Sequence, residues 1–268
     1  MSQAPPLAAA RFALRAEWTK LRTLPGTFWL LAAVVAATVG VSTAAAAATR
    51  CPAGLACPID SAKLTLTGVQ LGQAVAAVLA VLVVGGEYST GMIRVTLTAV
   101  PRRSMVLAAK AATVAGLTLA AGTIAVAGSL LAGALLLPGH GFTTARGYPA
   151  LSPADGPVLR AAAGSVLYLV LISLLALGVA TAVRDAAVAI GTVLALLYLF
   201  PIIAAVAACP HWQRHLQQIG PTTAGLEIEA TRNLGSLPIG PWAGLGVLAA
   251  WAAAAMVAGG LQLRFRDV

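Results

Sequence analysis

Residues with the chemistry for catalysis are few in this sequence, and their spacing matches no common catalytic motif. The chain has no G-x-x-x-x-G-K-[ST] loop for a nucleotide and no H-E-x-x-H, G-x-S-x-G or C-x-x-C motif. Four carboxylates lie in three separate stretches between apolar runs: Asp60, Asp155, Glu227 and Glu229. We do not expect them to converge into the paired groups that acid–base catalysis needs. The sequence therefore predicts that the chain is not an enzyme.

A second candidate for chemistry is the group Cys209, His211 and His215, which has a loosely metal-like spacing. A helix would place the two histidines on one face. However, Trp212 lies between them, which favours a short segment anchored at a membrane interface. We therefore expect no metal site and no cofactor bound by this chain.

The most distinctive stretch is residues 85–110, which begins Gly85-Gly86-Glu87-Tyr88-Ser89-Thr90-Gly91 and ends in a basic cluster. The cluster contains Arg94, Pro101-Arg102-Arg103 and Lys110. An ordinary basic membrane loop explains the arginines and the lysine. It does not explain the carboxylate of Glu87, the small residues after Tyr88 or the proline, so this loop is the leading candidate for a functional site.

The composition shows what kind of element must position these residues. Of the 268 residues, 59% are hydrophobic and 9% are charged, and the mean hydropathy is +0.90. A soluble domain carries about 25% charged residues because its surface faces water. The sequence therefore predicts an all-α integral membrane protein.

Apolar runs of about 20 residues, each long enough to cross the hydrocarbon core of a bilayer, predict six transmembrane helices. They lie at residues 28–48, 67–86, 111–137, 161–183, 186–208 and 242–261. The predicted organisation is a leader over 1–27, a six-span domain over 28–261 with a loop at 87–110, and a tail over 262–268. Only Arg184-Asp185 separates the fourth and fifth spans, which predicts a tight helical hairpin.

The distribution of basic residues predicts that both termini are cytoplasmic. With the N-terminus inside, eleven of the 17 Lys and Arg residues lie on the inner side and six on the longer outer loops. This is the positive-inside bias. The net charge of +9 therefore orients the chain in the membrane, and nucleic acid is not an expected partner.

Residues 7–24 are predicted to form an amphipathic helix on the membrane surface. Apolar residues recur there at helical spacing and include Trp18. Basic residues accompany this stripe and can meet anionic lipid headgroups: Arg11, Arg15, Lys20 and Arg22. A solvated basic leader is the alternative, and the regular stripe disfavours it.

Cys51 and Cys57 share a short loop bounded by Pro52 and Pro58, on the predicted outer side. A disulfide is favoured there over two free thiols, because an outer loop faces an oxidising compartment.

Gln70 and Gln73 are the clearest polar pair inside a predicted span. They either line a pathway or hydrogen-bond a neighbouring helix, and the second interpretation is favoured. The six predicted cores contain no Asp, Glu, Lys, Arg or His, so the relay that ion-coupled carriers use is missing.

Two segments resemble the permease subunits of type-2 ATP-binding-cassette transporters of the bacterial exporter kind. One is Glu17-Trp18-Thr19-Lys20-Leu21-Arg22 followed by Phe28-Trp29-Leu30-Leu31, similar to the interfacial helix and first span of that family. The other comprises Glu87-Tyr88, Gly91, Arg94, Pro101, Arg102 and Lys110. Met92 and Ser89 depart from the family pattern, which often has Thr and a bulkier basic residue at these positions.

The resemblance implies that residues 87–103 include a coupling helix that docks on a separate ATPase subunit, which would hold the ATP and Mg²⁺. It also implies pairing with a second copy or a related permease in the bacterial plasma membrane. Glu87 would stabilise the end of the second span by pairing with a basic residue such as Arg94 or Arg102. The alternative function is a membrane scaffold or regulatory subunit without transport.

Overall fold

The computed structural model describes residues 18–19, 25–52, 57–89, 103–143, 148, 151–152, 155–207 and 209–265. This part of the chain contains helices and no strand, and six of its helical segments are long and apolar enough to cross a membrane. The elements that form these spans are α2 (Pro25–Ala48), α3 (Ser61–Leu66) with α4 (Val69–Ser89), α6 (Arg103–Leu136), α7 (Gly156–Val183), α8 (Ala186–Val206) and α11 (Pro241–Phe265). The predicted fold class, an α-helical membrane protein with six spans, is confirmed.

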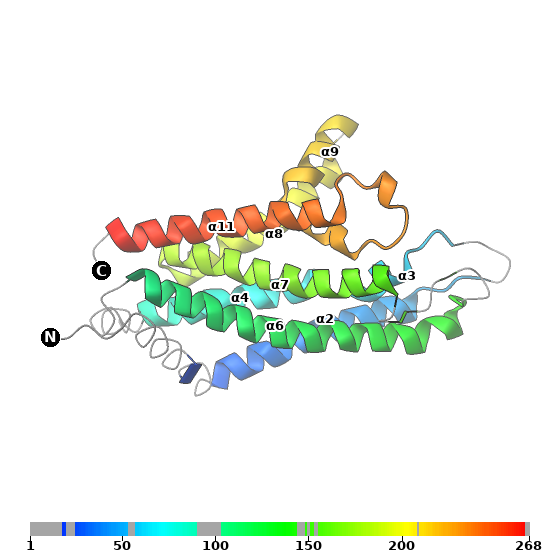
Figure 1. The fold of residues 1–268 in the computed structure, drawn as a ribbon, viewed down its shortest axis with the longest axis horizontal. Helices are drawn as coiled ribbons and strands as arrows, with labels where there is room; N and C mark the ends of the chain where they lie inside the picture. The colour runs from blue at the N-terminus through cyan, green and yellow to red at the C-terminus, as the bar shows by residue number, and fades with distance from the viewer. Residues whose placement is uncertain are drawn as a thin grey trace.

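The spans form an elongated bundle in which successive helices run in opposite directions (Figure 1). The starts of α2 and α6, the α7–α8 corner and the ends of α4 and α11 lie at one end, which we call the terminal end. The opposite end holds α3 and the loop with Cys51 and Cys57, and we call it the disulfide end. The short helix α9 (Pro210–Ile219) projects sideways from the bundle, and α10 (Pro221–Gly225) and the 3₁₀ turn η3 (Leu226–Glu229) follow it.

Two spans form the centre of the bundle. Of an 18-residue apolar stretch in each span, 61% is buried in the α3–α4 span and 56% in α7, but only 17% in α8. The core joins residues of α4, α7 and α8, including Val81, Tyr168, Leu169 and Leu197. Large apolar side chains on the other spans point outward, such as Leu135 on α6 and Val206 on α8. An apolar exterior of this kind is stable only where lipid covers it.

The α7–α8 hairpin follows from two adjacent polar residues. Arg184 takes the left-handed conformation (φ 63°), and its N–H donates to the Ala180 carbonyl at 2.9 Å. The Asp185 carboxylate then accepts a hydrogen bond from the Val188 N–H at 2.8 Å and caps α8. One residue thus ends a helix and the next begins another, so the predicted tight hairpin is confirmed.

Most predicted span boundaries lie within a few residues of the observed ones, but two differ in an informative way. The second span begins at Ser61 and is interrupted by a turn at Thr67–Gly68. The Gly68 N–H donates to the Ser42 hydroxyl on α2 at 3.1 Å, and a Cβ on Gly68 would collide with the Thr38 carbonyl. The third span begins at Arg103, so part of the predicted loop 87–110 is helix.

Candidate functional site

The first and last residues of the predicted loop 87–110, Glu87 and Lys110, form a buried ion pair at the terminal end. Lys110 Nζ lies 2.7 Å from Glu87 Oε1, and the two side chains are only 4% and 9% exposed. Glu87 is in the last turn of α4, and Lys110 is in the third turn of α6. A buried pair at this distance holds the two helices together, because separating the charges would take a close counter-charge from each in a place shielded from water.

The neighbouring residue Tyr88 connects the same point to the α7–α8 corner. The guanidinium carbon of Arg184 lies 5.9 Å from the centre of the Tyr88 ring, within the range of a cation–π contact. Arg184 also donates from Nη2 to the Gln262 carbonyl of α11 at 2.9 Å. A Cβ on Gly85 would come within 2.7 Å of the Ala186 Cβ, so α4 meets the start of α8 at close range. Five helices are therefore connected where the predicted loop begins.

The other residues predicted for this site are described only in part. Ser89 is the last residue of α4. Thr90, Gly91, Arg94, Pro101 and Arg102 lie outside the described residues. The structure gives Glu87 a partner that the sequence did not suggest, Lys110, while the suggested partners Arg94 and Arg102 lie outside the described residues. The signal for Lys110 was its place beside an apolar run, where a lysine needs a counter-charge.

Trp18 and Thr19 are the described residues of the predicted interfacial helix. Trp18 is 51% exposed, and Arg11, Arg15, Lys20 and Arg22 lie outside the described residues. The amphipathic helix over residues 7–24 therefore stays a prediction.

Gln73 contacts a neighbouring helix, as the favoured interpretation of the glutamine pair stated. Its side chain is fully buried, and its Oε1 accepts a hydrogen bond from the Tyr168 hydroxyl of α7. The side chain of Gln70 is exposed, and its backbone carbonyl accepts from the Tyr198 hydroxyl of α8 at 2.8 Å. Both contacts stabilise helix packing in a lipid environment.

Cys51 and Cys57 form a disulfide, the pairing that the sequence favoured, and the loop that they close is held by Tyr148. The Tyr148 hydroxyl donates to the Cys57 carbonyl at 2.8 Å and accepts from the Cys57 N–H at 3.1 Å. Phe142 packs edge-on against the Tyr148 ring, with ring centroids 5.0 Å apart. The disulfide end therefore has a small apolar core of its own.

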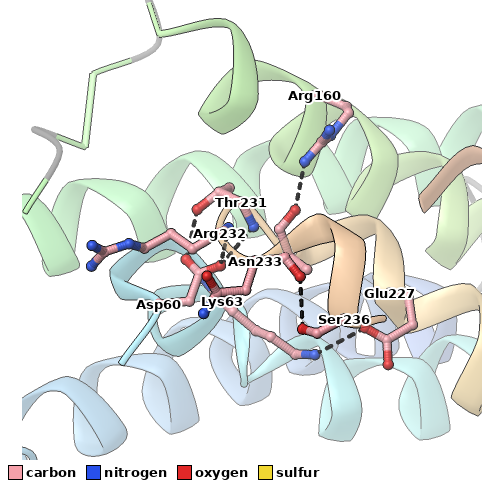
Figure 2. Close-up of polar contacts among 9 residues, drawn as sticks. Asp60, Lys63, Arg160, Glu227, Thr231, Arg232, Asn233 and Ser236 are labelled. Carbon is pink, nitrogen blue, oxygen red and sulfur yellow. Dashed lines mark hydrogen bonds and ion pairs between the residues drawn. The ribbon is translucent and has the colours of Figure 1, made fainter. Parts of the chain in front are cut away.

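A cluster of carboxylates at the disulfide end corrects the sequence prediction. Asp60, Glu227 and Glu229 were expected to stay apart, but η3 and the loop after it fold back against α3 and α7 (Figure 2). Asp60 Oδ1 accepts from the Thr231 hydroxyl at 2.7 Å, although 171 residues separate the two. The prediction failed because contacts between distant segments have no local sequence signal.

Hydrogen bonds and one ion pair hold this cluster together (Figure 2). Asp60 Oδ2 accepts from the N–H groups of Thr231 and Arg232 at 2.6 and 3.0 Å. Lys63 Nζ lies 3.3 Å from Glu227 Oε2. Arg160 donates from Nη2 to the Ala230 carbonyl at 2.5 Å. Together these contacts tie residues 227–232 to α3 and α7.

Asp60 is expected to be the main anchor of the cluster, because it also caps α3 by accepting from the N–H groups of Ala62 and Lys63. Asp60→Ala should lower the free energy of unfolding by roughly 2–3 kcal/mol, from one lost cap and the charged hydrogen bonds to residues 231–232. Thermal unfolding of the purified protein would measure this. Asp155→Ala is the matched control: Asp155 precedes α7 but makes no side-chain capping bond, so we expect a change below about 0.5 kcal/mol. Equal losses in the two variants would contradict the role of Asp60.

The His211–His215 pair does not form part of a metal site in the described chain. The two rings contact each other, with centroids 4.5 Å apart, and Cys209 is exposed. No group of three or more His, Cys, Asp or Glu residues with a metal-binding arrangement occurs among the described residues. Trp212 is 65% exposed on the projecting helix α9.

Comparison with known proteins adds no family to this description. No protein-family model matches the chain, and no curated protein matches it significantly. The fold defines a multi-pass α-helical membrane protein with a polar cluster at each end of its bundle.

Proposed function

We propose that this chain is the membrane-spanning permease subunit of a bacterial ATP-binding-cassette exporter. In this proposal it lies in the plasma membrane with both termini in the cytoplasm. The observation that carries the proposal is the buried ion pair between Glu87 and Lys110. Glu87 precedes residues 90–102 on α4, and Lys110 follows them on α6. A segment bounded by a buried ion pair transmits force to α4 and α6 together, because neither helix can shift alone without separating the charges.

The contacts around this pair support a coupling role. Tyr88, Arg184 and the Gln262 carbonyl extend the connection to the α7–α8 corner and to α11. An ATPase subunit that pushes on residues 90–102 would therefore move a connected set of helices. Packed helices joined in this way respond as a unit, because close-packed interiors deform little.

The distribution of charge is consistent with an external source of energy. Among the described side chains of the spans, the charged ones lie toward the helix ends: Lys63, Glu87, Lys110, Arg160 and Arg264. Ion-coupled carriers place such groups near the middle of the membrane. The sequence has no nucleotide-binding loop, so ATP and Mg²⁺ would bind the partner subunit. A second copy of this chain, or a related permease, would complete the transporter.

Site-specific crosslinking tests the proposal. Single cysteines at Thr90 and Arg94 are introduced into a Cys209→Ser background, which removes the one exposed free thiol of the described chain and keeps the disulfide. The protein is expressed in its native host, where its own partners are present, and purified in mild detergent. We expect the ATPase to co-purify and to crosslink at both positions. A cysteine at Ser236, exposed at the disulfide end, is the control and should not crosslink.

Two results would contradict the proposal. Absence of any co-purifying ATPase would favour a scaffold or regulatory role. Crosslinking from Ser236 in place of Thr90 and Arg94 would reverse the orientation and exclude residues 90–102 as the docking element.

A further inference from the structure

Glu229 is buried inside the bundle at the disulfide end, although glutamate is usually exposed. It ends η3, and it belongs to a segment, residues 221–230, that is inserted between α7, α8 and α11. We call these residues the inserted segment. The residue is 1% exposed, and its Oε1 lies 3.4 Å from the Ser165 hydroxyl of α7. An ionised carboxylate at such a position needs strong compensation, because burial removes its hydration.

The inserted segment packs tightly against α7 and α11, because glycines allow close approach where they meet. A Cβ on Gly164 of α7 would collide with the Ile228 side chain, and one on Gly244 of α11 would collide with the Ala224 carbonyl. A Cβ on Gly225 would come within 2.7 Å of the Tyr168 ring. The inserted segment is therefore closely packed against α7 and α11, and full hydration of Glu229 would require it to move outward.

The charges that face Glu229 do not compensate it well. The groups that act on Glu229 are Asp60 and Lys63 at the start of α3, Glu227 on η3 and Tyr168 on α7. Lys63 forms its ion pair with Glu227, and Arg160 donates to the Ala230 carbonyl. α10 has no ionisable residue, and the one on α11, Arg264, is at the terminal end. Two further carboxylates thus oppose a charge on Glu229.

We infer that Glu229 is a proton-binding site that keeps the inserted segment packed in the bundle when it is protonated and loosens that segment when it is ionised. The neutral acid fits this pocket because it needs no counter-ion and can hydrogen-bond Ser165. Release of the proton would place a third carboxylate beside a single lysine. The resulting repulsion and the need for hydration favour outward movement of residues 221–230.

The expected pH range follows from the same surroundings. The pKa of Glu229 is raised from 4.5 to about 8, mainly by burial and to a smaller extent by Glu227 and Asp60, whereas Lys63 and the hydrogen bond from Ser165 lower it. Because the folded state binds the proton more tightly than the unfolded state, the stabilisation is complete below about pH 4.5. It is lost as the pH rises toward about 8. One such group changes the unfolding equilibrium constant by up to about tenfold per pH unit in this window.

Thermal unfolding of the full-length protein in lipid nanodiscs tests the inference, and it needs no ATPase. We expect the wild type to lose stability between about pH 4.5 and 8, and Glu229→Gln to lose less, because a neutral amide cannot ionise. At about pH 9 the Gln variant should melt several degrees higher than the wild type. Asp155→Asn is the matched control: it removes a carboxylate that precedes α7 at the same end of the bundle and is not one of the charges that act on Glu229, so it should keep the pH dependence of the wild type.

Infrared spectroscopy supplies a direct readout. At about pH 6.5 the protein should show the carbonyl band of a protonated carboxylic acid, which disappears at higher pH and is missing in Glu229→Gln. If the Gln variant does not assemble, Glu229→Asp keeps an acid and should shift this band. The same pH dependence of stability in the wild type and Glu229→Gln would overturn the inference. So would an acid band that neither substitution at Glu229 alters.

Discussion

Replacing Lys110 with methionine is expected to lower the free energy of unfolding by about 3–5 kcal/mol. The substitution keeps most of the length of the side chain but removes the cation 2.7 Å from Glu87, in a place where both side chains are almost fully buried. The carboxylate of Glu87 then loses this counter-charge and cannot regain water without separating α4 from α6. Thermal or chemical unfolding in detergent micelles would measure the loss.

Two controls separate the ion pair from the charge itself. Arg264→Met also removes a cation at the terminal end, but Arg264 is exposed, so its effect should stay within about 0.5 kcal/mol. The double variant Glu87→Gln/Lys110→Met removes both charges and should recover most of the stability that Lys110→Met loses. A double variant as unstable as Lys110→Met would show that the pair is not the source of the effect. If the recovered double variant also uncouples ATP hydrolysis from the permease, the proposed coupling role gains direct support.

The contact between α7 and α11 predicts the second large effect. A Cβ on Gly178 would lie 2.6 Å from the Met256 nitrogen and still nearer to the Ala255 carbonyl carbon, so it would meet the backbone of α11. On the other side, a Cβ on Gly259 would lie 2.7 Å from the Gly178 carbonyl oxygen. Backbone atoms cannot rotate away as a side chain can. Gly178→Ala should therefore cost about 1–3 kcal/mol through overpacking, and Gly178→Leu should prevent assembly of the bundle.

Gly246→Ala on α11 and Gly191→Ala on α8 are matched controls, because a Cβ at either position meets no atom within 4 Å. Alanine is the better helix former, so these variants should be neutral or more stable by up to about 1 kcal/mol. The yield of monodisperse protein and its melting temperature would measure the series. If all three alanine variants behaved alike, α7 and α11 would not be in close contact at Gly178.

The two polar clusters are built on the same central helices. α7 contributes Arg160 and Ser165 at the disulfide end, and Arg184 directly follows it at the terminal end. The α3–α4 span contributes Lys63 at one end and Glu87 at the other. A displacement of either span would therefore reach both clusters. This arrangement relates the proton site at Glu229 to the proposed coupling segment through two shared helices.

Local patterns in the sequence were enough to predict the membrane fold. Apolar runs of about 20 residues located the spans, because a helix in lipid must satisfy its backbone groups within one continuous segment. Arg184-Asp185 predicted the α7–α8 hairpin, since no longer linker exists there. The spacing of Cys51 and Cys57 favoured their pairing. In each case the residues that decide the structure are neighbours in the chain.

Contacts between distant residues were decided by the tertiary structure alone. The sequence placed Glu87 at a helix end but not opposite Lys110, because that pairing depends on the length and rotation of α6, which begins earlier than predicted. It separated Asp60 from Glu227 and Glu229, although folding brings them into one cluster. Hydropathy records whether a helix enters lipid, but not which of its faces meets which neighbour. The burial of Glu229, and with it the proton-binding site, therefore emerges only when residues 221–230 insert into the bundle.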